Sequence, residues 1–351
     1  MNQTRSPQDT TAFLDEFRTA QISHLLTAAV AEFDVGAALE NGPLSYDQLR
    51  KKLGLADRSA IVLLTALRSI GLISVGANGS IELTGYGWEK MAPSSPFHLR
   101  GYIGLGAFSL DVQNMIACLK HDRPAGDVSF VYHENGPPSA LDDPATSDLL
   151  TRAMADRARN IAPTLAEQLD LSRSRCLIDV GGAHGLYSYH LLQKHDNLKA
   201  ILVDREPALN VAREYAAQLG VANRVEFVHG DIHTLQIPAE VDTVLMANIL
   251  HDYNAADAAA LVKHYAEALP PHGRLMILDA FLNSVPPGHP PVSDGPRAVA
   301  AYSGFLFSLC EGRCYRFDEA EAWLRDAGLQ VDRRRISVPA HGSLLTGIKP
   351  L

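Results

Sequence analysis

The spacing of apolar residues divides the chain into two regions with different periodicities. Over residues 13–35, apolar positions recur at helical intervals with polar residues between them, which predicts one or two amphipathic helices. From residue 175 onward, short apolar runs alternate with helical patterns, the arrangement expected of βαβ units in a parallel sheet. The pattern therefore predicts a helical N-terminal region followed by an α/β domain.

The N-terminal region has the elements of a winged helix. Ser45 and Gln48 have the form of a capping box that opens a short helix, and Asp57 is expected to cap a second helix over residues 58–70. Two strand-like runs then flank an Asn-Gly turn, which suits a hairpin. A winged helix can read DNA with its second helix, but here that helix is mostly apolar and carries only two basic residues. We expect it to pack or to dimerise.

Composition narrows the class of partner. The formal net charge of −9 argues against nucleic acid and anionic membranes, because phosphate binding needs clustered Lys and Arg. Four scattered cysteines indicate a reduced compartment, and no metal site is expected. The first ten residues are polar and lack the apolar stretch of a signal peptide. These features predict a cytoplasmic protein.

The middle of the chain is predicted to be helical around residues 100–120 and 148–169, with a Gly- and Pro-rich loop over residues 124–144 that suggests a lid or a partner contact. Met154 is a candidate to line an apolar pocket, although a Met at helical spacing also suits plain core. The expected division is a winged-helix domain over residues 1–95, a helical connector and lid over 96–170, and a cofactor-binding domain over 171–351.

The C-terminal domain contains five strand-like runs, and the first leads directly into a glycine-rich turn. The runs are CLIDV, AILVD, VEFVHGD, VDTVLMA and RLMILD, and the turn is GGAHG, followed by a helix over residues 186–194. Such a turn serves nicotinamide, flavin and adenosylmethionine sites alike, and also occurs simply to pack a helix against a strand. The turn alone does not identify the ligand.

Acidic residues end the next two strands. Asp204 can accept both ribose hydroxyls of an adenosine, and Asp231 can accept an adenine amino group, with Ile232 beside it as an apolar wall. Each acid also suits an ordinary turn or helix cap, but three successive strand ends of this kind favour a nucleoside site. Two last strand-like runs, LQVDRRRISV and SLLTGIK, would add an antiparallel hairpin. That hairpin is typical of the class I methyltransferase fold, a Rossmann-like doubly wound sheet with an antiparallel last strand.

DVGGAHG, the VDREP segment, the GD pair at 230–231 and above all NILHDY at 248–253 resemble the small-molecule O-methyltransferases of the plant caffeate and bacterial polyketide type. The resemblance covers nearly the whole chain. It implies S-adenosyl-L-methionine as cofactor, a small-molecule acceptor, and a homodimer formed through an N-terminal winged-helix domain. Neither nucleic acid nor membrane is implied as a partner.

The resemblance also implies roles for individual residues. His251 falls on the general base of the family's LHD motif, and Asp279 falls on the carboxylate that orients it. Asp252 either takes part in catalysis or caps the helix that follows. The cofactor set is Gly181, Gly182, Gly185, Asp204, Asp231, Ile232 and Asn248. The acceptor set is Met154, Tyr302 and Phe305.

Three positions depart from the family pattern. Ala183 stands where the first-turn motif has a third glycine, a mild change if its φ is negative. Ala247 and Asn248 stand where plant members commonly have a Lys before the LHD motif. Cys314 aligns with a Glu that supports the catalytic His, which would leave His251 with one carboxylate.

The sequence thus predicts transfer of a methyl group to a hydroxyl of a small aromatic or polyketide-like metabolite, with His251 as general base. An N- or C-methyltransferase of the same fold stays open, as does a hydroxylase or pericyclase that retains the cofactor site. A winged-helix regulator whose α/β domain senses a ligand is a third class.

Overall fold

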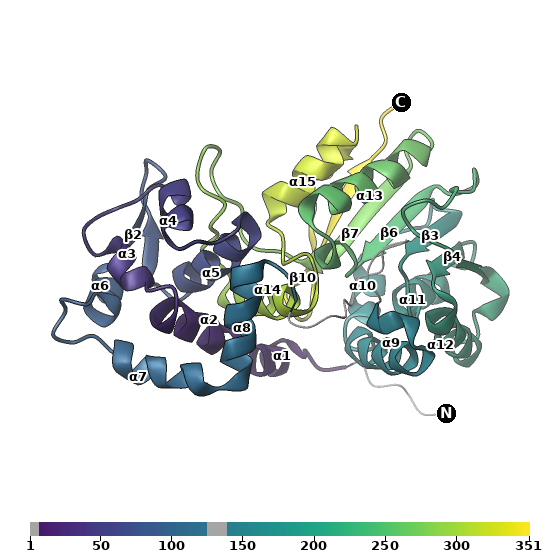
Figure 1. Cartoon of the computed structure of the whole chain (residues 1–351). Coiled ribbons are helices and arrows are strands. Elements are labelled where there is room, and N and C mark those ends of the chain that lie inside the picture. The colour runs from purple at the N-terminus through teal and green to yellow at the C-terminus, as the bar shows by residue number, and fades with distance from the viewer. Residues whose placement is uncertain (1–6, 125–138) are drawn as a thin grey trace. The chain divides into compact units, whose positions relative to one another are not determined.

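The computed structural model describes residues 7–124 and 139–351 and divides the chain into two compact units (Figure 1). One unit, here the sheet unit, contains the described parts of 7–14, 139–280 and 319–351. The other, here the helical unit, contains 15–124 and 281–318. A segment from the C-terminal half therefore folds with the N-terminal region. Most of the loop predicted over residues 124–144 lies outside the described residues.

The sheet unit is built on a mixed sheet with the strand order β5-β4-β3-β6-β7-β10-β8, and β9 pairs with β10. β5, β4, β3, β6 and β7 are parallel, whereas β10 runs antiparallel to β7, β8 and β9. The predicted class I methyltransferase fold is confirmed, including its antiparallel last strand. The strands are β3 Cys176–Val180, β4 Lys199–Asp204, β5 Val225–His229, β6 Thr243–Ala247, β7 Arg274–Ala280, β8 Gln330–Val331, β9 Ile336–Val338 and β10 Gly342–Ile348.

The five parallel strands are apolar because helices cover them. β3 is buried along its whole length, while β5, which ends the sheet, is half exposed. A large core joins the sheet to the helices that precede and follow β3. The helices and turns of this unit are α9 Pro144–Ala158, α10 Ala162–Gln168, α11 Leu186–Lys194, α12 Glu206–Gln218, α13 Ala255–Ala268, η2 Ala140–Asp142, η3 Ala222–Arg224 and η4 Leu250–Asp252. α1 Thr11–Arg18 and α15 Phe317–Asp326 each begin in one unit and end in the other.

The helical unit contains the predicted winged helix. Its elements are α2 Ala20–Ala31, α3 Val35–Leu39, α4 Tyr46–Lys52, α5 Asp57–Ser69, β1 Ile73–Val75, β2 Ile81–Leu83, α6 Gly85–Met91, α7 Arg100–Gly104, η1 Leu105–Phe108, α8 Leu110–His121 and α14 Arg297–Leu309. β1 and β2 form the antiparallel hairpin. The reciprocal hydrogen bonds of Ser45 and Gln48 confirm the capping box at α4.

The N-terminus of α5 differs from the prediction. The capping position is Ala56, and Asp57 is already the first helical residue. The Asp57 carboxylate instead accepts a hydrogen bond of 2.8 Å from the Tyr46 hydroxyl, so it is engaged between two helices rather than on its own helix. Along α5, residues 59–67 are buried, which confirms that this helix is built for packing.

The predicted helix around residues 100–120 is interrupted. α7 passes into the 3₁₀ turn η1, and α8 begins after Ser109, whose backbone is extended. No helix in the described ranges can by itself span a membrane; only the bent pair Arg100–Phe108 and Leu110–His121 meets the length and composition test. The second predicted helix, around residues 148–169, is likewise divided into α9 and α10.

Two glycines on α6 give a matched test of packing. A Cβ on Gly87 would lie 1.8 Å from the carbonyl oxygen of Leu72, whereas a Cβ on Gly85 would meet nothing within 4 Å. Gly87→Ala should therefore destabilise the protein by about 1–3 kcal/mol, because backbone must move. Gly85→Ala should be neutral or stabilising by up to about 1 kcal/mol. Urea unfolding midpoints measure both, and equal midpoints would contradict this packing.

Candidate active site

The predicted cofactor and catalytic residues lie together at one edge of the sheet. Parallel strands present their carboxyl ends at the same edge, and here each strand end carries one of these residues. In spatial order the ends carry Asp231 after β5, Asp204 on β4, the glycine-rich turn after β3, His251 after β6 and Asp279 on β7. The chain leaves β3 toward β4 on one side and returns through β6 on the other. Ligands of open α/β sheets bind at such a reversal.

The turn after β3 is held in an unusual backbone conformation. Gly181 and Gly185 have φ values of 62° and 72°, and Ala183 has a φ of 43°. The expectation of a negative φ at Ala183 is therefore wrong, and the left-handed conformation costs a non-glycine residue about 1–2 kcal/mol. The Ala183 N–H donates to Asp204 Oδ2 at 2.8 Å, a contact that holds this residue in place.

Asp204 links two strand ends. Its second oxygen, Oδ1, accepts the N–H of Arg205 at 2.7 Å, so each carboxylate oxygen takes one backbone amide and keeps further acceptor capacity. Burial raises the pKa of Asp204, and the two amides act in the opposite direction. These contacts exclude simple helix capping, because one of the two amides comes from the turn after a neighbouring strand.

At the end of β5, Asp231 Oδ1 accepts the N–H of His233 at 2.9 Å, the form of an ordinary Asx turn. The turn reading of Asp231 thus holds alongside the ligand reading, since Oδ2 stays available. Ile232 is buried beside it, as an apolar wall requires.

Asp179, near the end of β3, is a buried acid that the sequence reasoning missed. Its Oδ2 accepts the Ser188 hydroxyl at 2.6 Å, while its Oδ1 has no hydrogen-bond partner in the described structure. Burial raises the pKa of Asp179 to about 7. The sequence signal was available, because this Asp opens the DVGGAHG run.

His251 is buried and contacts two carboxylates. Its Nδ1 lies 2.7 Å from Asp279 Oδ1, and its Nε2 lies 3.6 Å from Asp252 Oδ1. Burial alone lowers the pKa of His251, but the charges of Asp279 and Asp252 and the hydrogen bond to Asp279 outweigh burial and raise it. Asp252 does not cap α13, because Asn254 occupies the capping position. His251 thus has a second carboxylate close by, whatever the effect of Cys314.

Three further groups near His251 were not found from the sequence. Arg157, on α9, is close enough for its charge to act on His184, Tyr187 and His251. Burial and then this charge lower the pKa of His184 to about 3, so its ring is neutral. The Tyr187 hydroxyl accepts a hydrogen bond of 3.2 Å from Asn248 Nδ2. Neither spacing nor motif marks Arg157, because only the fold brings α9 to these strand ends.

The predicted acceptor residues are divided between the units. Tyr302 and Phe305 lie on α14 of the helical unit, where their rings are stacked with centroids 6.4 Å apart. The Arg18 guanidinium lies 3.8 Å from the centroid of the Tyr302 ring, a contact the sequence does not reveal. Met154 belongs to the sheet unit and is 42% exposed, so the plain-core interpretation is wrong. Cys314 is buried in the helical unit, where its N–H donates to Ser303 Oγ.

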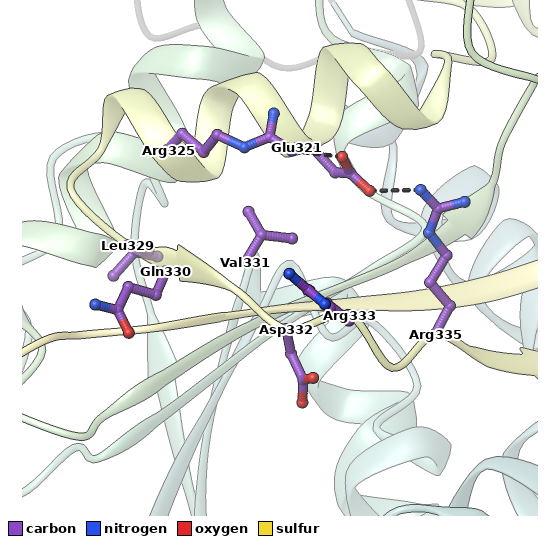
Figure 2. Close-up of a pocket in the computed structure, with 8 residues that line it drawn as sticks. All are labelled: Glu321, Arg325, Leu329, Gln330, Val331, Asp332, Arg333 and Arg335. Atoms are coloured by element: carbon purple, nitrogen blue, oxygen red, sulfur yellow. Dashed lines mark hydrogen bonds and ion pairs between the residues drawn. The ribbon is translucent and has the colours of Figure 1, made fainter.

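A surface pocket of about 620 Å³ between α15 and the β8–β9 connection contains none of the predicted site residues (Figure 2). Three arginines line it, but Arg325 and Arg335 both pair with Glu321, as the dashed lines in Figure 2 show. Its charge is thus largely compensated within the pocket.

The strand-edge residues fit S-adenosylmethionine. This ligand is rich in hydrogen-bond donors and positive charge, and the edge offers the spare acceptor capacity of Asp204 and Asp231 together with the unmatched oxygen of Asp179. With the antiparallel β10, the fold and this acceptor-rich edge define a class I S-adenosylmethionine-dependent methyltransferase.

Comparison with known proteins identifies the family. The O-methyltransferase domain model matches residues 129–314, and the chain therefore belongs to the O-methyltransferase family. It is similar to an O-methyltransferase family 2 protein from Planctomyces limnophilus solved in complex with apigenin, with a TM-score of 0.87, 35% identity and coverage of 98% of this chain and 97% of that one. S-adenosylmethionine is the cofactor of this family.

Two enzymes of Streptomyces are also similar over most of their length. A 3-hydroxy-5-methyl-1-naphthoate 3-O-methyltransferase of Streptomyces sahachiroi is 27% identical, with 92% of this chain and 91% of the relative covered. A tetracenomycin polyketide synthesis 8-O-methyltransferase of Streptomyces glaucescens is 28% identical, with 93% of each covered. The family acts on small molecules.

The buried acid Asp179 predicts a pH-dependent stability. Its folded pKa is raised from an ordinary value of 3.8 to about 7, so the folded state loses stability as pH rises from 4 through 7. Asp179→Asn removes this ionisation. The variant should be more stable than the wild type at pH 8, by at most on the order of 4 kcal/mol, and the difference should shrink toward pH 4.

Urea unfolding midpoints at several pH values measure this difference. Asp196→Asn, which changes an exposed carboxylate of the same unit, is the control and should show no such trend. A constant difference between Asp179→Asn and wild type across pH would contradict the assigned ionisation.

Proposed function

We propose that this O-methyltransferase transfers the methyl group of S-adenosylmethionine to a hydroxyl of a small aromatic or polyketide-like molecule, with His251 as general base. The observation that carries the proposal is the buried hydrogen bond between His251 and Asp279 at the strand edge that bears the cofactor residues. A His oriented by a carboxylate is suited to accept the proton of a phenol near neutral pH.

The cofactor supplies an electrophilic methyl group on a sulfonium sulfur. In this proposal the N–H at Nδ1 of His251 donates to Asp279, and Nε2, which lies 3.6 Å from Asp252 Oδ1, acts as the base. Nε2 of His251 would take the proton of the acceptor hydroxyl as that oxygen becomes methylated. Asp279 and Asp252 then stabilise the imidazolium. Holding the two reactants in line supplies much of the remaining rate.

The other strand-edge residues have binding roles in this proposal. Asp204 accepts the ribose hydroxyls and Asp231 the adenine amino group. Ile232 packs on the adenine, and Asn248 supports the site through Tyr187. The turn glycines Gly181, Gly182 and Gly185 let the backbone approach the ligand. Arg157, whose charge already acts on His251, pairs with the cofactor carboxylate in this proposal.

The acceptor class rests on the relatives and on the aromatic side chains. The printed acceptors of the relatives are a hydroxynaphthoate and a polyketide, and apigenin is bound by the protein of Planctomyces limnophilus. Met154, Tyr302 and Phe305 are the apolar and aromatic side chains proposed to contact a ring of this kind. The resemblance of the sequence to the small-molecule O-methyltransferases supports the assignment of these three residues to the acceptor site.

S-adenosylhomocysteine titration in a calorimeter tests the cofactor site. Wild-type protein should bind it, and Asp204→Ala should lose at least tenfold in affinity, because two hydroxyls lose their acceptor. Absence of binding to folded wild type would refute the proposal. Mass spectrometry on a panel of phenols, amines and activated aromatics then identifies the methylated atom, and a product without added methyl mass would favour a hydroxylase or pericyclase.

The role of His251 predicts a pH profile. His251→Ala should bind S-adenosylhomocysteine normally but lose about 10²–10⁴-fold in kcat. Wild-type kcat/KM should fall as pH drops through the raised pKa of His251, since the protonated ring cannot act as base. In Asp279→Asn that acidic limb should move to lower pH. His98→Ala, an exposed His of the helical unit, is the control.

We also propose a cytoplasmic homodimer formed through the winged-helix domain of residues 1–95, with 96–170 as helical connector and substrate lid and 171–351 binding the cofactor. We extend the dimer contact to the start of the connector, residues 97–110. Apolar side chains exposed on the single chain support a second copy as partner. They are Phe97, Leu99, Tyr102, Leu105, Phe108 and Leu110.

Sedimentation velocity tests the dimer. Phe108 is 83% exposed, so Phe108→Glu should shift a dimer toward monomer without unfolding the chain, because the new charge is desolvated only in the interface. Leu351→Glu, at a position that is 98% exposed and lies outside the proposed interface, should leave the dimer intact. A monomeric wild type at micromolar concentration would refute this assembly.

A further inference from the structure

Side chains of α5 hold the backbone on both sides of α14, although the two helices are more than 200 residues apart in sequence. After α14, Arg58 Nη1 donates to the carbonyl oxygens of Cys310 at 2.8 Å and Gly312 at 3.2 Å. Before α14, Arg68 donates to the carbonyl oxygen of Val292. All of these residues belong to the helical unit.

A hydrogen bond near the middle of α5 adds to the same contact. The N–H of Ser293, which follows Val292, donates to the Thr65 hydroxyl at 3.3 Å. Side chains at the start, middle and end of α5 therefore contact segments that flank α14. With both flanking segments bound, the position of α14 is fixed along its axis as well as by packing.

Arg58 joins three elements rather than two. Its Nε donates to Asp122 Oδ1 at 3.0 Å and its Nη2 to the Asp122 carbonyl at 2.8 Å, at the C-terminus of α8. Its guanidinium also lies 4.4 Å from the centroid of the Phe307 ring on α14. The side chain is only 13% exposed. A planar guanidinium can make these contacts at once, whereas a lysine ammonium presents a single point of charge.

α14 carries Tyr302 and Phe305, the two aromatic residues proposed to contact the acceptor. We propose that Arg58 is a positioning residue for the acceptor: by holding the segment after α14, it fixes where these two rings stand. The inference rests on the proposed function for the acceptor roles. The hold of Arg58, Thr65 and Arg68 on the segments that flank α14, here called the clamp, rests on the hydrogen bonds alone. Because misplacement of a reactant by about 1 Å can cost 10²-fold in rate, a loosened α14 should weaken acceptor binding and turnover.

The test compares Arg58→Met and Arg58→Lys with Arg100→Met. Arg100 pairs with Asp34 in the same unit and is also mostly buried, but its hydrogen bond does not reach residues 281–318. Hydrogen exchange of residues 297–312 reports the clamp. Calorimetry measures binding of apigenin and of S-adenosylhomocysteine, and steady-state kinetics give acceptor KM and kcat for the best substrate of the panel.

We expect Arg58→Met to speed exchange over residues 297–312 at least tenfold and to raise the apigenin Kd and acceptor KM at least tenfold. S-adenosylhomocysteine affinity should stay within twofold of wild type. Arg58→Lys should show the same changes to a smaller extent, and it decides the question if Arg58→Met does not fold. Arg100→Met should leave exchange in this segment and acceptor KM unchanged, even if its Tm falls.

Unchanged exchange in both Arg58 variants would overturn the clamp, and faster exchange with unchanged apigenin Kd and acceptor KM would overturn the positioning role. A loss of S-adenosylhomocysteine binding equal to the loss of apigenin binding would mean general unfolding and would also refute it. Failure of the proposed function looks different. Wild-type protein would then bind no S-adenosylhomocysteine or methylate no member of the panel, while the exchange measurement would still decide whether Arg58 holds α14.

Discussion

The parallel pairing of β3 with both β4 and β6 is the constraint from which the site follows. β3 is the strand at which the connections diverge, to β4 on one side and to β6 on the other, and ligands of open α/β sheets bind at the carboxyl end of such a strand. The chain must turn sharply there, and it does so with left-handed backbone at Gly181, Ala183 and Gly185. The neighbouring strand ends then bring acids to both sides of that turn. A single topological feature thus determines which residues meet at this edge of the sheet.

The buried acids at this edge have different hydrogen-bond partners, and these partners fit the different roles proposed for them. Each carboxylate oxygen of Asp204 accepts one backbone amide, and both oxygens can still accept a ligand's hydroxyls. One oxygen of Asp279, Oδ1, accepts from His251 and from the N–H of Ala280, so this oxygen orients the ring. Asp179 has only Ser188 and one unmatched oxygen. The acid paired with a histidine and the acid paired with backbone amides thus stand on different strands of this edge, in line with the separate roles proposed for them.

Sequence predicted the parts of this structure that local interactions decide. The bounds of α11 and the strands of the parallel sheet follow from apolar periodicity, and the capping box of α4 follows from one pair of side chains. The φ of Ala183 could not be predicted, because a motif records residue types and not backbone angles. Periodicity also missed the break between α7 and α8, since an apolar pattern can continue while the helix axis changes direction.

Contacts between distant segments were beyond sequence reasoning for a different reason. The apolar pattern of α5 predicted that it is buried but not against what, and its partner α14 lies in a segment that sequence assigned to the cofactor domain. The order of segments along the chain therefore differs from their division into compact units. The strand-end residues proposed to bind the cofactor and to move the proton belong to one unit, whereas Tyr302, Phe305 and the side chains that hold α14 belong to the other. Substitutions at Tyr302 and Phe305 therefore alter the aromatic surface of the helical unit, whereas the hydrogen bonds of Asp204 and His251 lie within the sheet unit.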